Sequence, residues 1–252
     1  MNNPSKGTFL GHPKGLFLLF STELWERFSY YGMRAVLVLY LTDLTANGGL
    51  GWTQADALKL YGIYTGLVYI TPIIGGWLAD TFLGQRRAIL IGAIFMAAGQ
   101  FTLALPHAMF PEMVNTLFYA GLGLLILGNG LFKPNISTMV GDLYQEGDHR
   151  RDGAFTIFYM GINLGSLLAG VICGAAATAY GWQAAFVSAG IGMLLSLVVQ
   201  ATMAQRFLGD IGRMPAAQRA ALQRSKEQKA PLTKQEVDRI KVILVLGLFT
   251  II

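Results

Sequence analysis

Residues 23–34, ELWERFSYYGMR, place four full charges inside an apolar segment that is long enough to cross a membrane. Each such charge costs roughly 2.5–3.5 kcal/mol at the centre of a spanning helix, so it is kept only where it pairs or lines an aqueous path. At about 100° per residue, the polar side chains of this stretch fall on one helical face. They are Glu23, Glu26, Arg27, Tyr30 and Arg34. The stretch therefore predicts a membrane helix whose polar face looks into a cavity.

The composition of the chain is that of a membrane protein. Of its 252 residues, 54% are hydrophobic and 13% are charged, whereas a soluble domain carries about 25% charged residues. The one cysteine, Cys173, lies in an apolar run, which excludes a disulfide framework and a thiolate metal site. The net charge of +5 falls mainly in loops beside apolar runs. Membrane topology explains it there better than a nucleic-acid partner does.

Six apolar stretches approach or exceed the ~20 residues that cross a bilayer. They cover about residues 15–43, 57–79, 87–106, 113–140, 154–179 and 183–205. A polar, basic segment at 206–239 predicts a cytoplasmic linker, and a seventh apolar stretch runs over 240–252. The sequence thus predicts an all-α membrane protein. Residues 1–205 would form a six-helix transmembrane bundle, followed by the linker and the start of a seventh helix, with a C-terminal bundle missing.

The charges of the loops predict the orientation of these helices. Basic residues precede the first span, separate the second from the third, and separate the fourth from the fifth: Lys6, Lys14, Arg86, Arg87, Arg150 and Arg151. The alternate loops, near 44–56, 106–112 and 179–182, contain no Lys or Arg. The positive-inside rule therefore predicts a cytoplasmic N-terminus and a cytoplasmic linker.

The polar stripe contains both a pair and an unpaired cation. Glu23 and Arg27 are i,i+4 neighbours and can pair directly. Arg34 has no acid within its own turns, and Asp43 is nine residues away. An arginine that faces a cavity without a carboxylate can bind an anion such as a substrate carboxylate. The alternative is a set of structural ion pairs that only fix helix packing.

The fourth span contains a further buried charge. Lys133 stands in the block GNGLFKPN, residues 128–135, about ten residues from the basic loop. A charge at that depth needs a carboxylate partner, and Glu23 and Glu26 are the candidates on another helix. Pro134 removes a backbone hydrogen bond and permits a kink. A lysine that snorkels to the membrane surface is the alternative.

The block GGWLADTFLGQRR, residues 75–87, ends the second span at its basic end. Asp80 can accept hydrogen bonds from Arg86 and Arg87, or cap a neighbouring helix. The glycines allow helices to approach closely. These features predict a conformational latch rather than a substrate contact.

Two stretches of neutral polar residues can face the same cavity. The block FYMGINLGS, residues 158–166, carries Tyr159 and Asn163 one turn apart. The second span carries Tyr61, Thr65 and Tyr69 at successive turns. Each set can also serve helix packing alone. The sets indicate a ligand site only if they face the same cavity as the charged residues.

The sequence contains no constellation for hydrolytic chemistry, no phosphate-binding loop and no metal-ligand cluster. His12, His107 and His149 all stand in loops, so none is placed to relay protons inside the membrane. Catalytic residues, a metal and an organic cofactor are therefore not expected, which argues against a membrane enzyme.

The pattern Glu-x-x-Glu-Arg-Phe-x-Tyr-Tyr-Gly at residues 23–32 resembles the signature of the proton-dependent oligopeptide transporters, a branch of the major facilitator superfamily. The blocks at 75–87, 128–135 and 158–166 match the same family in the expected order. The resemblance implies the N-terminal half of a fold with two six-helix bundles that rock around a central cavity. It also implies symport of di- and tripeptides with protons by a monomer. The short loops look bacterial, which predicts the inner membrane.

The resemblance also implies roles for individual residues. By match to the motifs, proton coupling falls to Glu23, Glu26, Arg27 and Lys133, and the latch to Asp80, Arg86 and Arg87. Contacts with the peptide fall to Tyr30, Tyr31, Arg34, Tyr69, Lys133 and Asn163, with Arg34 and Lys133 attracting its carboxylate. Animal members use a histidine in the second span, which this chain lacks. The open alternatives are another small solute, such as nitrate, a drug-like compound or an amino-acid derivative, or a non-transporting receptor.

Overall fold

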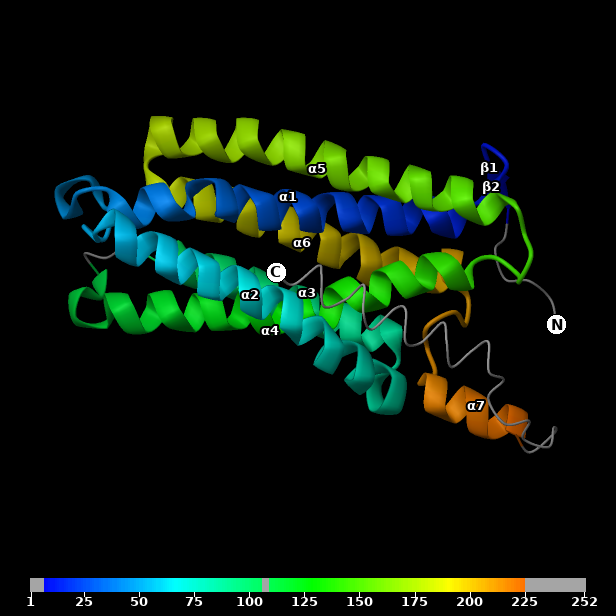
Figure 1. Ribbon diagram of the computed structural model, residues 1–252. Coiled ribbons are helices and arrows are strands. Elements are labelled where there is room, and N and C mark those ends of the chain that lie inside the picture. Colours follow the sequence, from blue (N-terminus) through cyan, green and yellow to red (C-terminus); the bar gives the residue numbers. More distant parts are fainter. Residues whose placement is uncertain (1–6, 106–108, 225–252) are drawn as a thin grey trace.

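The computed structural model describes residues 7–105 and 109–224. Six long helices run alternately in opposite directions through the molecule (Figure 1). They are α1 (Lys14–Thr42), α2 (Gln54–Leu78), α3 (Gln85–Leu103), α4 (Val114–Asp142), α5 (Arg150–Tyr180) and α6 (Trp182–Leu208). Each predicted span corresponds to one of these helices, with ends that agree within four residues. The predicted seventh span lies outside the described residues.

Shorter elements occupy the two ends of the bundle. A hairpin of β1 (Thr8–Phe9) and β2 (His12–Pro13) precedes α1. A π-helical segment joins α2 to α3, and 3-10 turns precede α2 and α4: Ala79–Leu83, Thr45–Asn47 and Pro111–Met113. Helix α7 (Ala216–Arg224) follows α6. In Figure 1 the hairpin, the α4–α5 connection and α7 lie at one end, while the α1–α2 and α5–α6 connections lie at the other. The basic loops therefore share one end, as the charge pattern predicts.

Local sequence explains where these helices begin and end. The Thr53 side chain accepts a hydrogen bond from the backbone N–H of Asp56 at 3.2 Å, which caps α2. Between α5 and α6 the chain turns at Gly181, whose φ of 87° is a conformation that glycine adopts without steric cost. The helices themselves follow from long apolar runs, because a backbone in lipid must satisfy its own hydrogen bonds.

Five helices, α2 to α6, are long and apolar enough to span a membrane. Helix α1 is also long enough, with 29 residues. It differs from the other five in composition, because it carries a stripe of charged residues. Its apolar residues, such as Leu19, Met33 and Leu37, are fully buried among the other helices. Helix α1 is therefore an inner helix of the bundle, and it carries charges that would be costly in contact with lipid.

The packing of the helices has an internal symmetry. Helix α1 packs against α5 and α6, and α4 packs in the same way against α2 and α3. Helices α3 and α6 contact each other, whereas α1 and α2 touch only slightly. Because α1 and α4 run in opposite directions, the two halves have the arrangement of inverted three-helix repeats. The first helix of each repeat packs against the last two helices of the other repeat, so α1 and α4 occupy equivalent central positions.

Glycines set the closest approaches between helices. A Cβ atom at Gly75 of α2 would collide with the carbonyl oxygen of Gly130 on α4. A Cβ atom at Gly165 of α5 would collide with the carbonyl oxygen of Leu24 on α1. Small residues permit such backbone contacts between membrane helices. Both contacts lie about one turn from a predicted site residue, Lys133 on α4 and Arg27 on α1.

The hairpin is attached to the α4–α5 connection. The Arg150 side chain donates to the Asp148 carboxylate at 2.7 Å and to the Gly11 carbonyl at 3.0 Å. The hydrogen bonds that the side chain and backbone of Arg150 donate to the Asp148 carboxylate lower its pKa to about 2. His12 Nδ1 forms a further hydrogen bond with the Tyr144 hydroxyl at 2.8 Å. The start of α1 is thereby fixed relative to the start of α5.

Candidate functional site

Three charges meet on α1 near the middle of the bundle. Arg27 Nε lies 3.0 Å from Glu23 Oε1 and also contacts Glu26 Oε2. The three residues are 4%, 3% and 0% exposed, respectively. The predicted Glu23–Arg27 pair is thus present. Arg27 also pairs with Glu26, a contact that the i,i+4 rule does not predict.

One guanidinium shared by two carboxylates leaves the cluster short of positive charge. Two ionised carboxylates and one arginine sum to −1, and a net buried charge is costly. Asn129 of α4 donates to Glu26 Oε1 at 3.4 Å. Glu23 Oε2 and Arg27 Nη2 are buried without a hydrogen-bond partner in the described part of the chain. The cluster therefore has unused capacity for a proton or a further cation.

Lys133 is the further cation within electrostatic reach. Its Nζ lies over the ring of Tyr69 on α2, 4.8 Å from the centroid, and it interacts electrostatically with both glutamates. Among the described residues, however, Lys133 forms no direct ion pair. The predicted contact with a carboxylate is therefore absent here, and the ammonium lies over an aromatic face instead.

Arg34 lies two turns beyond Arg27 on the same face of α1, and its partners are tyrosines. The Tyr61 hydroxyl accepts from Arg34 Nε at 3.0 Å and also from Nη2. The Tyr30 hydroxyl accepts from Nη1 at 3.3 Å. The guanidinium also lies over both rings. No carboxylate of the described residues pairs with it, so the structure agrees with the prediction of a cation without an acid.

The remaining predicted contact residues divide into two sets. Tyr31 packs edge-on against Tyr30, with ring centroids 5.2 Å apart, and Tyr69 lies beneath Lys133. Asn163 is exposed on α5, and no hydrogen bond within the described ranges ties it to the others. The structure therefore joins both Arg34 and Lys133 to α2, and it leaves Asn163 exposed on α5.

Two residues that hold the charged side chains of the site had no role assigned from the sequence. Tyr61 stands in the predicted tyrosine stripe, and its hydroxyl is the main acceptor for Arg34. Asn129 stands beside Lys133 in a quoted block, and it reaches Glu26. The signal in both cases was a polar residue in an apolar run, but its partner lies on a helix far away in the sequence.

The predicted latch is built differently from the expectation. Arg86 is buried and donates to the carbonyl oxygens of Ala204 at 2.9 Å and Gly209 at 2.7 Å, and to the Gln205 side chain. Asp80 is exposed and forms no ion pair within the described ranges, and Arg87 is exposed. The expectation that Asp80 accepts from these arginines is wrong for Arg86. The last carbonyls of α6 have no intrahelical partner and attract the guanidinium instead.

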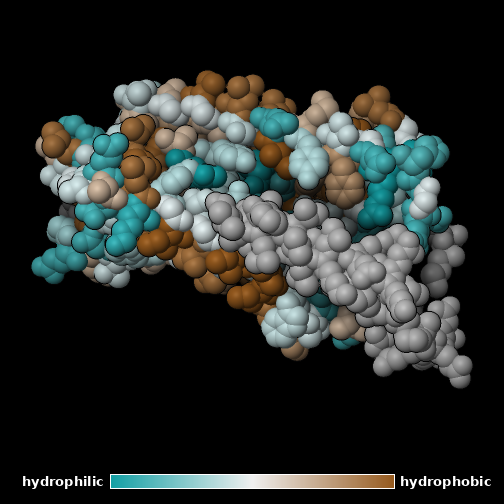
Figure 2. All heavy atoms as spheres, in the orientation of Figure 1, coloured by the Kyte–Doolittle hydropathy of each residue, from teal (hydrophilic) through white to brown (hydrophobic). Residues whose placement is uncertain are grey.

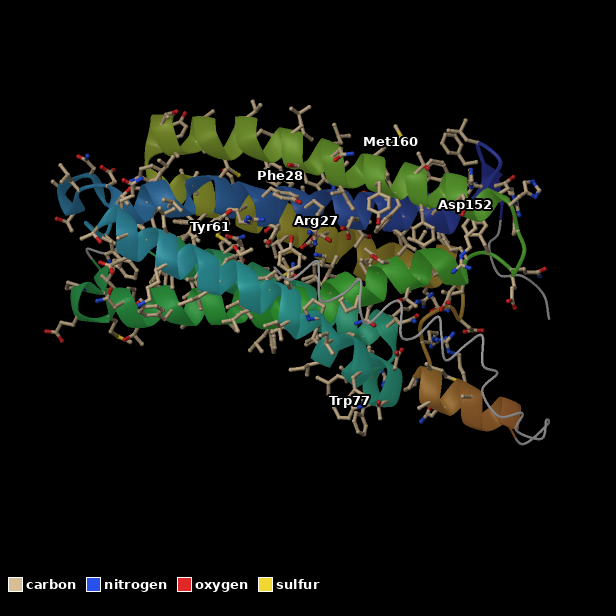
Figure 3. The ribbon with its side chains drawn as sticks, in the orientation of Figure 1. Arg27, Phe28, Tyr61, Trp77, Asp152 and Met160 are labelled. Atoms are coloured by element: carbon tan, nitrogen blue, oxygen red, sulfur yellow. The ribbon has the colours of Figure 1, made fainter. Side chains whose placement is uncertain are left out.

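The site lies on an open face of the bundle. Figure 2 shows hydrophilic residues along the midline of this face, with hydrophobic residues above and below them. In Figure 3, Arg27 lies in the middle of the molecule between α1 and α2, and Tyr61 lies further along α2. Within the described ranges there is no group of His, Cys, Asp and Glu that could hold a metal ion. The face offers fixed cations and hydroxyls, which suit an anionic, hydrogen-bonding ligand.

Comparison with known sequences identifies the chain's relatives. Residues 86–210 match the POT family (PTR2). The chain is 50% identical over 209 residues to an uncharacterized transporter, YclF, of Bacillus subtilis, which covers 83% of this chain and 41% of that protein. It is 47% identical over 216 residues to a di-/tripeptide transporter of Lactococcus lactis, covering 85% of this chain and 42% of that protein. The chain thus spans about two fifths of the length of these relatives.

Solved structures agree with the sequence matches. A crystal structure of a peptide transporter POT in complex with sulfate has a TM-score of 0.79 and 43% identity, covering 98% of this chain and 46% of that one. A POT family transporter in complex with 5-aminolevulinic acid has a TM-score of 0.78 and 38% identity, covering 98% and 47%. On these matches in sequence and in backbone, the chain belongs to the POT family of transporters, and its helices form the N-terminal six-helix bundle of a major facilitator superfamily fold.

Proposed function

We propose that the complete protein imports di- and tripeptides together with protons. The observation that carries this proposal is Arg34, a cation that two tyrosines hold and that has no carboxylate partner among the residues the structure describes. It lies two turns from a buried cluster in which one arginine serves two glutamates. A ligand site next to a group that can take up a proton is the minimum that symport requires. The name of the Lactococcus lactis relative, a di-/tripeptide transporter, supports the choice of substrate.

The ligand face would bind the peptide through its carboxyl end. A carboxylate at Arg34 forms charge-assisted hydrogen bonds of fixed geometry, which the two tyrosine hydroxyls already orient. Lys133 adds a second positive charge on α4. The hydroxyls of Tyr30, Tyr31 and Tyr69 and the amide of Asn163 would bind the peptide backbone. The amino end would meet the C-terminal bundle, which the proposal requires to close the cavity.

Proton coupling would use the imbalance of the buried cluster. With both glutamates ionised, Arg27 and Lys133 are both attracted to them. Protonation of one glutamate removes that attraction and frees a cation for the peptide carboxylate or for a carboxylate across the cavity. Each protonation state thereby favours a different packing of α1 against its neighbours, and a population shift between packings is what alternating access needs. Protons alone would couple the cycle, without a bound cofactor.

The proposed setting is the inner membrane of a bacterium, with the N-terminus in the cytoplasm and the monomer as the active unit. It is supported by the basic loops at one end of the bundle (Figure 1). The latch residues Asp80, Arg86 and Arg87 lie at that end, where Arg86 ties α3 to the last turn of α6. We propose that this tie moves as one piece with the bundle while the cytoplasmic side opens and closes.

The test is uptake of a labelled dipeptide into liposomes that contain the complete gene product. An inward proton gradient should drive accumulation above the external concentration, and a protonophore should abolish it. Empty liposomes with the same gradient are the control. Uptake that only equilibrates, with or without the gradient, would contradict symport.

A second candidate substrate is another small carboxylate-bearing solute. It is favoured by one specific observation, the similarity to a POT family transporter solved with 5-aminolevulinic acid. Competition separates the two. If 5-aminolevulinic acid blocks dipeptide uptake only at concentrations far above those of a dipeptide competitor, peptides are the preferred substrate. If it competes better, the substrate assignment changes while the carboxylate role of Arg34 remains.

A further inference from the structure

A second concave site lies on the other side of α1, at the end of the bundle that carries the basic loops. It is a cavity of about 310 Å³ between α1 and α6, roofed by the hairpin. Residues from the first two turns of α1 and the last turns of α6 line it, together with one hairpin residue: Lys14, Phe17, Leu18, Ser21, Val199, Met203, Phe207 and Phe9. The volume lies at the lower end of the range for small-molecule sites.

The lining of this groove is apolar along its length and cationic at its mouth. Phe9 packs edge-on against Phe17, with centroids 4.9 Å apart, and closes the outer end. Lys14 is exposed and forms no ion pair among the described residues. Arg206, one residue before Phe207, lies over the Phe207 ring at 5.5 Å from its centroid. An exposed lysine thus lines a hydrophobic slot, and an exposed arginine lies against Phe207 of the same lining.

The position of the groove relative to the bilayer decides what can fill it. Helix α6 is long and apolar enough to span a membrane. In a bilayer its side chains Met203 and Val199, about one and two turns inward from Arg206, would lie at the depth of lipid chains. Lys14 and Arg206 lie at the ends of their helices, where the bilayer surface must be. A basic pocket between membrane helices at the surface fits the head group of an anionic lipid. Free solutes would leave either the apolar slot or the two cations unmatched.

We propose that the groove between α1 and α6 binds one anionic phospholipid, with an acyl chain along Phe17, Val199 and Met203 and the phosphate at Lys14 and Arg206. Helix α1 begins at Lys14 without a side-chain cap, and the Lys14 N–H donates to the Gly7 carbonyl at 3.3 Å, which ties the hairpin to the start of the helix. Gly15 brings α1 against the Phe207 carbonyl and Leu208 of α6. The lipid therefore binds at the joint between the charge-bearing helix and its scaffold, and this site is independent of the ligand face.

The experiment is native mass spectrometry of the complete protein. The protein is incubated in detergent with equimolar phosphatidylglycerol and phosphatidylcholine, and the lipids that stay bound after removal of the detergent are identified. The wild type should retain one phosphatidylglycerol in preference to phosphatidylcholine. Lys14→Ala and Arg206→Ala should each lower that preference about fivefold, from about 1 kcal/mol per cation near a membrane surface. Both residues are exposed, so neither change should affect folding. Lys59→Ala removes an exposed lysine at the opposite end and should leave the preference unchanged.

Val199→Trp tests the slot separately, because it fills the slot without touching the cations. It should reduce retention of both lipids. Equal retention of the two lipids by the wild type would overturn the proposal, as would a loss of preference in Lys59→Ala as large as in Lys14→Ala. Displacement of phosphatidylglycerol by an equal concentration of free glycerol phosphate would show that a headgroup anion alone occupies the site, which also overturns it.

Discussion

At the scale of single residues, the arrangement around Arg27 separates a switch from a static ion pair. A buried pair in which every oxygen is satisfied would hold α1 in one state. Here Glu23 Oε2 and Arg27 Nη2 lack hydrogen-bond partners among the described residues. Lys133 lies over the ring of Tyr69 and forms no ion pair with either glutamate in the described structure. Removal of one member of such a group leaves the others as uncompensated buried charge, which is costly. The members therefore act as a unit.

Lys133→Ala and Glu26→Gln should each abolish accumulation of a dipeptide driven by a proton gradient in the complete protein. Each change removes a charge on which the exchange of partners depends. Exchange of labelled for unlabelled dipeptide without a gradient should persist in Glu26→Gln, because the ligand contacts at Arg34 and Lys133 are intact. The measurement is uptake and counterflow in the same liposomes, with Lys59→Ala as the matched loss of a lysine. Full gradient-driven uptake in either mutant would remove these residues from the coupling step.

Arg34→Ala should weaken binding of free dipeptides by about tenfold to a hundredfold, the value of a charged hydrogen bond of roughly 1.5–3 kcal/mol. Binding of the same dipeptides as C-terminal amides should change little, because they offer no carboxylate. Affinities from competition for uptake give the comparison. Tyr61→Phe, which keeps the ring but removes the hydroxyl acceptor of Arg34, should show a weaker effect of the same kind. Equal losses for acids and amides would make Arg34 a structural residue.

At the scale of helices, the backbone contact between α1 and α5 determines where Arg27 stands. Gly165 faces the Leu24 carbonyl, and a Cβ atom there would also approach Arg27 Cβ at 3.1 Å. The helices can approach this closely only because one of them has no side chain at the crossing. The position of the buried charges is therefore set by a residue that carries no charge.

Gly165→Ala should lower the unfolding free energy by about 1–3 kcal/mol, the usual cost of overpacking, and should shift α1. Gly170→Ala is the matched control on the same helix, because nothing lies within 4 Å of its Cβ position. It should be neutral or stabilise by roughly 0.5–1 kcal/mol. Thermal unfolding midpoints of both variants in one detergent check the pair. Similar midpoints for the two would show that the α1–α5 contact is looser than described.

At the scale of the whole molecule, the two three-helix groups explain why one face is open. Helix α1 is held by α5 and α6, and α4 by α2 and α3, so α1 and α2 hardly touch. The polar stripe of α1 lies between α1 and α2, where Arg34 reaches Tyr61. In a complete transporter of this fold the second bundle would cover it, and the substrate site would lie between the two.

The charge distribution predicts which end of the molecule lies in the cytoplasm. In a Cys173→Ser background, Arg150→Cys should react with a membrane-impermeant thiol reagent only from the cytoplasmic side, and Asn47→Cys only from outside. Both positions are exposed, and Cys173 is buried. Leu167→Cys, exposed within a span, should react from neither side because lipid covers it. Labelling of position 150 from outside would reverse the topology.

The positions of the helices and the face on which the charges lie follow from local sequence. Helix formation in lipid depends on a local run of about 20 apolar residues, and the helical period alone brings Glu23, Arg27 and Arg34 to one side. The pairing of Glu23 with Arg27 and the lack of an acid for Arg34 also follow from spacing within one helix. These features needed no knowledge of how the helices pack.

The contacts between groups on different helices depend on how the helices pack. Tyr61 binds Arg34, Asn129 reaches Glu26, and Lys133 lies over Tyr69 instead of pairing with a glutamate. Arg86 binds the Ala204 carbonyl, which is 118 residues away in the sequence. It does not form the expected ion pair with Asp80 within the described residues. Such contacts depend on crossing points and on the rotation of each helix about its axis, which glycines such as Gly165 set through backbone approach. A shift of one residue in either helix turns the side chain by about 100°, so no pattern within a single segment can specify them.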